Sequence, residues 1–267
     1  MDPQHTESMA QHIWPDDREA ARREYEATPS RLLKYQHNIV ECGPALVGQR
    51  VLDMGSGNGL FAYLAMRHGA AHVVGVEPRG MYVNGLNRFA ARNSMPMEFI
   101  RGYDTDLGGL VREHAIDTVM LISVDDITNW EAMMHDLRRS TVRWVIMQVT
   151  TIPDQWVDYR IEIHDHVRVG GGMPVGFTLH YDAVNNGTKA AINPLDKASV
   201  DPDTGLQDRP EVIYSLKSQQ YTRRFIDHAG FKVESCESQP LPITRSPGEW
   251  ASSVLHQWYL LRNDQQG

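Results

Sequence analysis

The chain has 267 residues, 41% of them hydrophobic and 22% charged, which is enough apolar material for a well-formed core. It contains no apolar run of roughly 18 residues or more, which excludes a membrane-spanning helix, and its two cysteines predict no disulfide framework. The formal net charge of −8 argues against binding to long nucleic acid. Together with an N-terminus that lacks the pattern of a signal peptide, these features predict a cytoplasmic protein with no membrane partner, and they make a nucleic-acid partner the less favoured alternative.

The N-terminal region is polar and predicts helices. Residues 16–26 are typical of a charged helix that begins at Asp16 or Asp17, and residues 31–42 predict a second helix that ends before a Gly-Pro pair. We interpret residues 1–45 as a helical lid over the rest of the domain. The candidate substrate contacts in this lid are Tyr25 and Tyr35.

From residue 50 onward, short apolar strands alternate with helices. The expected strands are 51–54, 73–76, 97–100, 116–123 and 142–149, and the expected helices are 60–68, 81–93 and 130–139. Such alternation indicates parallel strands joined by right-handed crossovers, with ligands bound beyond the carboxyl ends of the strands. We therefore expect residues 46–150 to form a ligand-binding core, with the 55–59 loop, Glu77, Asp104 and Asp125 along one rim.

The alternation stops in residues 151–217, which are rich in glycine, proline and aromatic residues. A structureless loop of this length is uncommon, so we predict an inserted substrate-binding region with short strands at 161–163 and 167–169. Residues 218–267 then complete the core of a single domain spanning 1–267. They contain a helix over 218–228 and, at the sheet edge, an antiparallel hairpin of the strands 231–235 and 257–261.

The first strand of the core runs into a glycine-rich turn, Asp53-Met54-Gly55-Ser56-Gly57-Asn58-Gly59. The turn lacks the Gly-Lys-Ser/Thr ending of a P-loop, and Asp53 would repel the pyrophosphate of a dinucleotide. An amino-acid-like ligand fits better, because its ammonium group can meet Asp53 and its carboxylate the N–H groups at the start of the next helix. Glu77, at the end of the next strand, can accept both hydroxyls of a ribose. Tyr103 and Asp104 can contact an adenine.

These segments carry a family resemblance. VLDMGSGNGLFA, VVGVEPRG, FIRGYDTDL and IDTVMLISVDD resemble motifs I to IV of the class I S-adenosylmethionine-dependent methyltransferases, over roughly residues 30–150 and about the last forty. The resemblance implies an α/β fold with a seven-stranded, mostly parallel sheet, helices on both faces and a terminal antiparallel strand. It implies S-adenosyl-L-methionine as cofactor. The candidate cofactor-binding residues are Asp53, Gly55, Ser56, Gly57, Gly59, Glu77, Pro78, Tyr103, Asp104 and Ser123.

The sequence indicates the residues that contact the methyl acceptor less clearly than those that bind the cofactor. Asp125 and Asp126 follow the fourth strand, where the family places substrate-facing residues, although either can also cap the next helix. His164 and His166 share one face if their segment is a strand, and either can act as a general base. They lack a third metal ligand, so we expect no metal. The candidate catalytic residues are thus Asp125, Asp126, His164 and His166, and the further candidate substrate contacts are Trp156, Tyr159 and His180.

The sequence favours an enzyme that methylates an O or N atom, or alternatively a C atom, of a small molecule in specialised biosynthesis. Two alternatives stay open. One is an RNA-modifying enzyme of the kind that alkylates wobble uridine in transfer RNA, and the other is a non-catalytic cofactor-binding protein. A homodimer also stays open.

Overall fold

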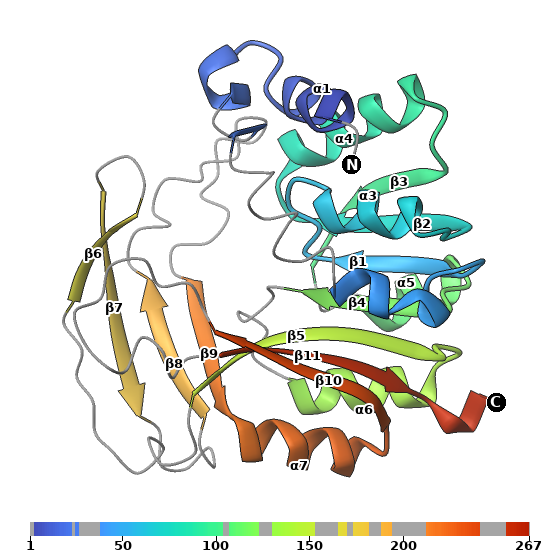
Figure 1. Cartoon of the computed structure of the whole chain (residues 1–267), viewed down its shortest axis with the longest axis vertical. Coiled ribbons are helices and arrows are strands. Elements are labelled where there is room, and N and C mark those ends of the chain that lie inside the picture. Colours follow the sequence, from blue (N-terminus) through green and yellow to red (C-terminus); the bar gives the residue numbers. More distant parts are fainter. Residues whose placement is uncertain are drawn as a thin grey trace. The chain divides into compact units, whose positions relative to one another are not determined.

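The computed structural model describes residues 3–22, 25–26, 38–103, 107–122, 130–152, 165–169, 173–181, 188–193, 212–240 and 255–266. The chain divides into two compact units. The first comprises Met1–Ile122, Arg139–Ile146 and Gln265–Gly267, and the second Ser123–Arg138 and Met147–Asp264. Each is considered by itself (Figure 1). Over the described ranges, no helix combines the length and apolar character needed to span a membrane.

The first unit is built on parallel strands. Strand β1 (Arg50–Met54) lies between β2 (His72–Glu77) and β4 (Thr118–Ile122), and β2 also pairs with β3 (Met97–Arg101). The resulting order is β3-β2-β1-β4. Nearly every residue of β1, β2 and β4 is buried, as expected for parallel strands that are covered on both faces. All the strands run in the same direction, so β1 and β2 end at the same edge of the sheet.

Helices connect these strands. They are α3 (Leu60–Arg67), α4 (Gly80–Arg92) and α5 (Leu107–Glu113), and the short 3₁₀ helix η1 (Gly43–Ala45) precedes β1. Helices α3 and α4 lie where the sequence predicts them. Helix α5 was not predicted, since its sequence LGGLVRE contains two glycines and buries only Leu107 and Val111.

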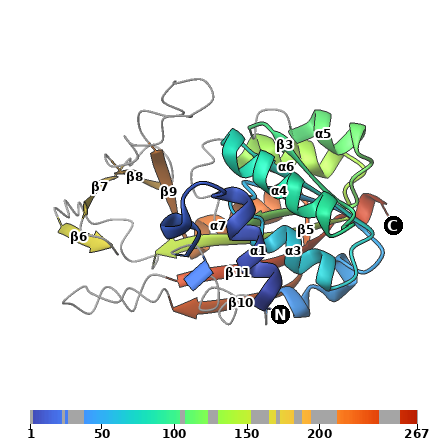
Figure 2. The ribbon, with the colours of Figure 1, turned by 90° about the horizontal axis from the view of Figure 1, so that it is seen from above.

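A helix that the sequence analysis did not predict, α1 (Pro3–Ile13), packs against α4 (Figure 2). It buries Met9, Ala10 and Ile13. The two helices approach closely at Gly85, where an added Cβ would lie 2.6 Å from the His12 carbonyl oxygen. The helical turn over 18–22 follows, and the Asp17 carboxylate caps it by accepting bonds from two backbone N–H groups. The predicted start at Asp16 or Asp17 is thus confirmed at Asp17.

The second unit contains the region predicted as an insertion. After β5 (Trp144–Ile152), which starts in the first unit, come β6 (Asp165–Val169), β7 (Met173–Tyr181), β8 (Thr188–Asn193) and β9 (Val212–Ser218). Strands β6 to β9 pair with their sequence neighbours in antiparallel fashion, and β9 pairs with β5 in parallel. The predicted strand at 167–169 lies within β6, and the one predicted at 161–163 lies outside the described residues.

The remaining elements of the second unit complete the core sheet. They are α6 (Trp130–Arg139), α7 (Gln219–Ala229), β10 (Lys232–Pro240) and β11 (Leu255–Arg262). The short η7 (Asp264–Gln266) begins at the last residue of this unit and continues into the first unit. Strand β11 pairs with β5 and β10, and the β10–β11 pair is antiparallel, as predicted. Strands β1 to β5 with β10 and β11 give the expected seven-stranded, mostly parallel sheet with a terminal antiparallel strand.

Candidate ligand site at the end of the first strand

Three glycines give the loop after β1 its shape. Gly55, Gly57 and Gly59 have φ values of 72°, 52° and 76°, in the left-handed region that favours glycine. At Gly59 a side chain is excluded by packing as well, because an added Cβ would lie 2.7 Å from Cδ2 of Leu86. The loop is fastened to the neighbouring strand, since the N–H groups of Gly55 and Ser56 both donate to the Val76 carbonyl oxygen at 2.9 Å.

Asp53 is the buried acid of the site. It is 1% exposed and faces Gly75 in the register of β1 and β2. Burial raises its pKa from 3.8 to about 7, a hydrogen bond from the Ala62 backbone opposes the rise, and the charge of Glu77 adds to it. Its Oδ2 atom is buried with no hydrogen-bond partner within the described structure. An orphaned carboxylate oxygen of this kind is costly and marks a place where a ligand donor fits.

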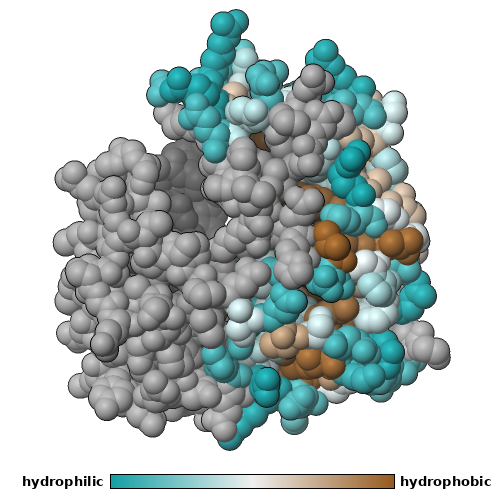
Figure 3. Space-filling view, viewed as in Figure 1, coloured by the Kyte–Doolittle hydropathy of each residue, from teal (hydrophilic) through white to brown (hydrophobic). Residues whose placement is uncertain are grey.

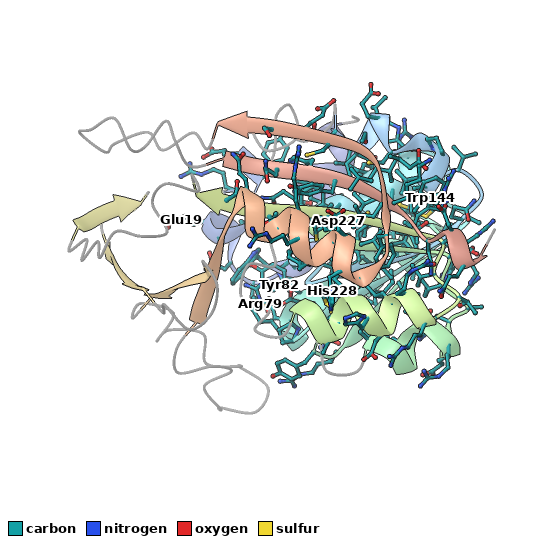
Figure 4. The ribbon with its side chains drawn as sticks, turned by 90° about the horizontal axis from the view of Figure 1, so that it is seen from below. Glu19, Arg79, Tyr82, Trp144, Asp227 and His228 are labelled. Atoms are coloured by element: carbon teal, nitrogen blue, oxygen red, sulfur yellow. The ribbon has the colours of Figure 1, made fainter. Side chains whose placement is uncertain are left out.

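Glu77, at the end of β2, is the second acid. It is 3% exposed, and its Oε2 accepts a hydrogen bond from the Gly57 N–H at 2.9 Å. Its Oε1 accepts from the backbone N–H of Arg79 at 3.2 Å and from Nε of the same residue at 2.5 Å. The Arg79 guanidinium lies over the ring of Tyr82, 4.1 Å from its centroid (Figure 4). Glu77 thus joins the glycine loop to the start of α4.

The N-terminus of α3 differs from the sequence-based expectation. The Leu60 N–H donates to Oδ1 of Asn58 at 3.2 Å, and the Ala62 N–H is the backbone donor to Asp53. The prediction that this helix end offers free N–H groups to a ligand carboxylate is therefore wrong for these two groups. The chain's own side chains already cap them, because the short loop brings both back over the first turn.

The structure describes three of the other predicted cofactor residues, Ser56, Pro78 and Tyr103. The Ser56 hydroxyl is buried without a partner among the described residues, and it lies 3.0 Å from where a Cβ on Gly75 would stand, over strand β2. The Pro78 carbonyl oxygen accepts a hydrogen bond from Nε of Arg101 at 2.9 Å. Tyr103 is half-buried just after β3. Asp104 and Ser123 lie outside the described residues.

The predicted substrate and catalytic residues are mostly beyond what the structure describes. Tyr25 is described and half-buried, and it lines a cavity in the N-terminal region. His166 lies in β6 opposite Gly176, and His180 lies in β7 opposite Ala190. The predictions outside the described residues are Tyr35, Asp125, Asp126, Trp156, Tyr159 and His164.

Arg79 is a site residue that the sequence analysis did not single out. It forms the ion pair to the buried Glu77 and stacks on Tyr82. A basic residue two positions after an acid at a strand end is a usable signal, because the turn folds the second side chain back onto the first. Tyr82, one helical turn further on, was equally visible in the sequence.

The arrangement defines the chemistry of the site. A partnerless carboxylate oxygen on Asp53 suits an ammonium group, and the fixed carboxylate of Glu77 suits a pair of hydroxyls. The positive-φ glycines between them let a ligand approach the backbone closely. The described residues thus bring together two of the four features predicted for this rim, namely the glycine loop and Glu77.

The comparisons with known proteins concern the fold. No protein-family model matches the chain, and no curated protein matches it in sequence. Among solved structures, a putative S-adenosylmethionine-dependent methyltransferase from Listeria monocytogenes is similar, with a TM-score of 0.54 and 14% identity over 85% of this chain and 96% of that one. A geranyl diphosphate methyltransferase in complex with SAM has a TM-score of 0.55 and 11% identity over 93% and 92%. The cyclase SpnF has a TM-score of 0.51 and 11% identity over 86% and 80%. This chain therefore has the class I methyltransferase fold.

Proposed function

We propose that this protein binds S-adenosylmethionine between Asp53 and Glu77 and transfers its methyl group to an O or N atom, or alternatively a C atom, of a small molecule. The observation that carries the proposal is the buried Oδ2 of Asp53, which has no partner within the described structure and stands beside a loop of positive-φ glycines. We also propose that the enzyme acts in the cytoplasm, in a biosynthetic pathway.

The residues present fit this cofactor. Asp53 would hold the ammonium group of the methionine part, and Glu77, kept in place by Gly57 and Arg79, would accept the ribose hydroxyls. Gly55, with its positive φ, would let the cofactor lie against the backbone. When bound, S-adenosylmethionine supplies an electrophilic methyl group on a sulfonium sulfur. The chain's own contribution is then to align the acceptor and exclude water.

The similar structures support the cofactor more strongly than the reaction. Two of them carry methyltransferase names, and one of these is a complex with SAM, whereas SpnF is named a cyclase. A shared fold does not fix a reaction, so methyl transfer rests on the site and needs its own test.

A small acceptor is favoured over RNA by charge. The net charge of −8 would repel a polyanion, whereas a pocket for a small molecule places no demand on overall charge. We propose that the region 151–217 selects the acceptor. The proposed contacts in this region are Trp156, Tyr159 and His180. The candidates for proton transfer or orientation are His164 and His166 in the same region and Asp125 and Asp126, which precede it.

The first experiment measures binding of S-adenosylhomocysteine by isothermal titration calorimetry. We expect Glu77→Gln to weaken binding at least about tenfold, because it removes the charge from two ligand hydrogen bonds. Asp53→Ala is expected to have a similar effect. Glu113→Gln is the matched control, because Glu113 is an exposed acid at the end of α5, and it should bind like the wild type. Circular dichroism checks that each variant is folded.

Equal affinities in the wild type and in both folded site variants would contradict the cofactor assignment. Formation of S-adenosylhomocysteine in the presence of candidate acceptors separates an enzyme from a non-catalytic binding protein. A gel shift with bulk transfer RNA tests the RNA-modifying alternative, for which we expect no shift at moderate salt.

A further inference from the structure

The N-terminal region forms an open cavity of about 480 Å³, and neither Asp53 nor Glu77 lines it. It lies between α1 and the segment that follows it, and its volume is in the range of small-molecule pockets. The surface of residues 14–22 is mostly hydrophilic on the face shown in Figure 3. The side chains that line the cavity and bear on its chemistry are Glu7, Gln11, Trp14, Arg18, Arg22 and Tyr25.

One wall of the cavity is anchored to the core of the first unit. The Trp14 indole meets the Tyr82 ring edge-on, with 6.1 Å between the ring centroids. Helix α1, which leads into Trp14, is held on α4 by a bond from the Arg88 side chain to the His12 carbonyl oxygen at 2.9 Å. The indole is therefore a fixed part of the wall. Its Nε1 atom is buried and has no hydrogen-bond partner in the described part of the chain. Buried donors in proteins are nearly always hydrogen-bonded, so this N–H group is a place where an acceptor atom of a ligand fits.

The charged side chains of the cavity are unequally engaged. Gln11 donates to Oε1 of Glu7 at 3.1 Å, and Arg22 faces Glu26 at 3.6 Å. Arg18 makes no hydrogen bond or ion pair with any residue that the structure describes. Of the two arginines at the cavity, Arg18 is thus the one without an acidic partner among the described residues, and its planar fork of donors matches a carboxylate.

We propose that this cavity is a second small-molecule site and binds a flat aromatic molecule that carries one carboxylate. Arg18 receives the carboxylate, the Trp14 N–H donates to an acceptor atom of the ligand, and Tyr25 contributes an aromatic surface. A flat ring suits a wall made of aromatic side chains, and a carboxylate matches Arg18, the one arginine of the described lining that has no acidic partner there. Neither Asp53 nor Glu77 lines the cavity, so the proposal does not depend on the cofactor assignment. It gives Tyr25, predicted above as a contact of the methyl acceptor, a different ligand.

The experiment is a titration of the full chain, without cofactor, with indole-3-carboxylate and benzoate, each paired with its neutral amide. We expect the carboxylates to bind with dissociation constants below about 1 mM and the amides at least about tenfold more weakly. Arg18→Gln should remove the preference for the acid. Trp14→Phe, which keeps an aromatic ring but lacks the N–H, should weaken binding about 3- to 10-fold. Arg67→Gln, an exposed arginine at the end of α3 that does not line the cavity, is the matched control and should leave binding unchanged.

Two results would overturn the proposal. One is the absence of binding by both carboxylates at millimolar concentration, and the other is binding that Arg18→Gln and Trp14→Phe leave intact. Arg18 is exposed, so its variant tests the charge without disturbing the fold. Affinity for S-adenosylhomocysteine, measured in the same variants, separates the two sites. It should be unchanged in Arg18→Gln whether or not the cofactor assignment holds.

Discussion

The buried carboxylate of Asp53 is expected to lower the stability of the ligand-free protein above neutral pH, and Asp53→Asn should relieve that cost. Burial is the main cause of its raised pKa, from 3.8 to about 7. Because each tenfold change in an ionisation equilibrium is worth about 1.4 kcal/mol, raising the pKa from 3.8 to about 7 costs about 4 kcal/mol. The side chain is 1% exposed, so solvent does not screen this cost. The amide of the variant keeps the shape and the acceptor for the Ala62 N–H.

The direction in which stability changes with pH follows from proton uptake by Asp53. Because the folded pKa lies above the unfolded one, the folded protein binds more protons between about pH 4 and pH 7, and stability falls as pH rises through this window. At about pH 5 the loss is already about 1.6 kcal/mol, and above about pH 8 it reaches its full value of about 4. The stability advantage of Asp53→Asn over the wild type should therefore grow by about 2.5 kcal/mol between these two pH values.

Urea-induced unfolding followed by circular dichroism at about pH 5 and about pH 8.5 measures this difference. The comparison between variant and wild type cancels the titration of all other groups. Glu113→Gln, which changes an exposed acid in the same way, should show no such growth. A variant-minus-wild-type difference that stays the same within about 0.5 kcal/mol at the two pH values would refute the view that Asp53 is a desolvated carboxylate.

Two further predictions concern the same unit. Affinity for S-adenosylhomocysteine should rise by up to about tenfold per pH unit between about pH 5 and pH 7 and then level off, because the ammonium group of the ligand requires ionised Asp53. Calorimetry with Asp53→Asn should show no such rise. Gly85→Ala should loosen α1 from α4 at a cost of about 1–3 kcal/mol, since its Cβ would lie 2.6 Å from Ile13 Cα. Hydrogen exchange of residues 3–13 measures this release. Gly109→Ala in α5, where nothing lies within 4 Å, should instead stabilise slightly, and equal effects of the two would contradict the close approach.

The sequence was most informative where the signal is local. Strand β1, its glycine turn and the acids Asp53 and Glu77 were predicted because an apolar run, a turn and a strand-end acid occupy consecutive residues. The pairing of β10 with β11 was also predicted, since too few residues separate them for a second crossover helix. These features depend little on the rest of the chain.

Features that depend on distant contacts were missed. Helix α1 has the polar sequence PQHTESMAQHI, and its few apolar residues become a packing face only when α4 presents Gly85 and Phe89 to it. Strands β7 to β9 owe their positions to mutual pairing and to the pairing of β9 with β5. Residue patterns within a strand do not show which partner it will find.

The occupied N–H groups at the start of α3 affect how the site would bind its ligand. Because Asn58 and Asp53 cap the Leu60 and Ala62 N–H groups, these two groups do not attract a ligand carboxylate. The remaining attraction comes from the Asp53 and Glu77 carboxylates, which favour cations and hydroxyl donors over anions. A phosphate would meet two buried acids, and the basic side chain described beside them, Arg79, already pairs with Glu77. The structure thus strengthens the exclusion of nucleotide phosphates that the sequence suggested, and it places the discrimination in the two acids.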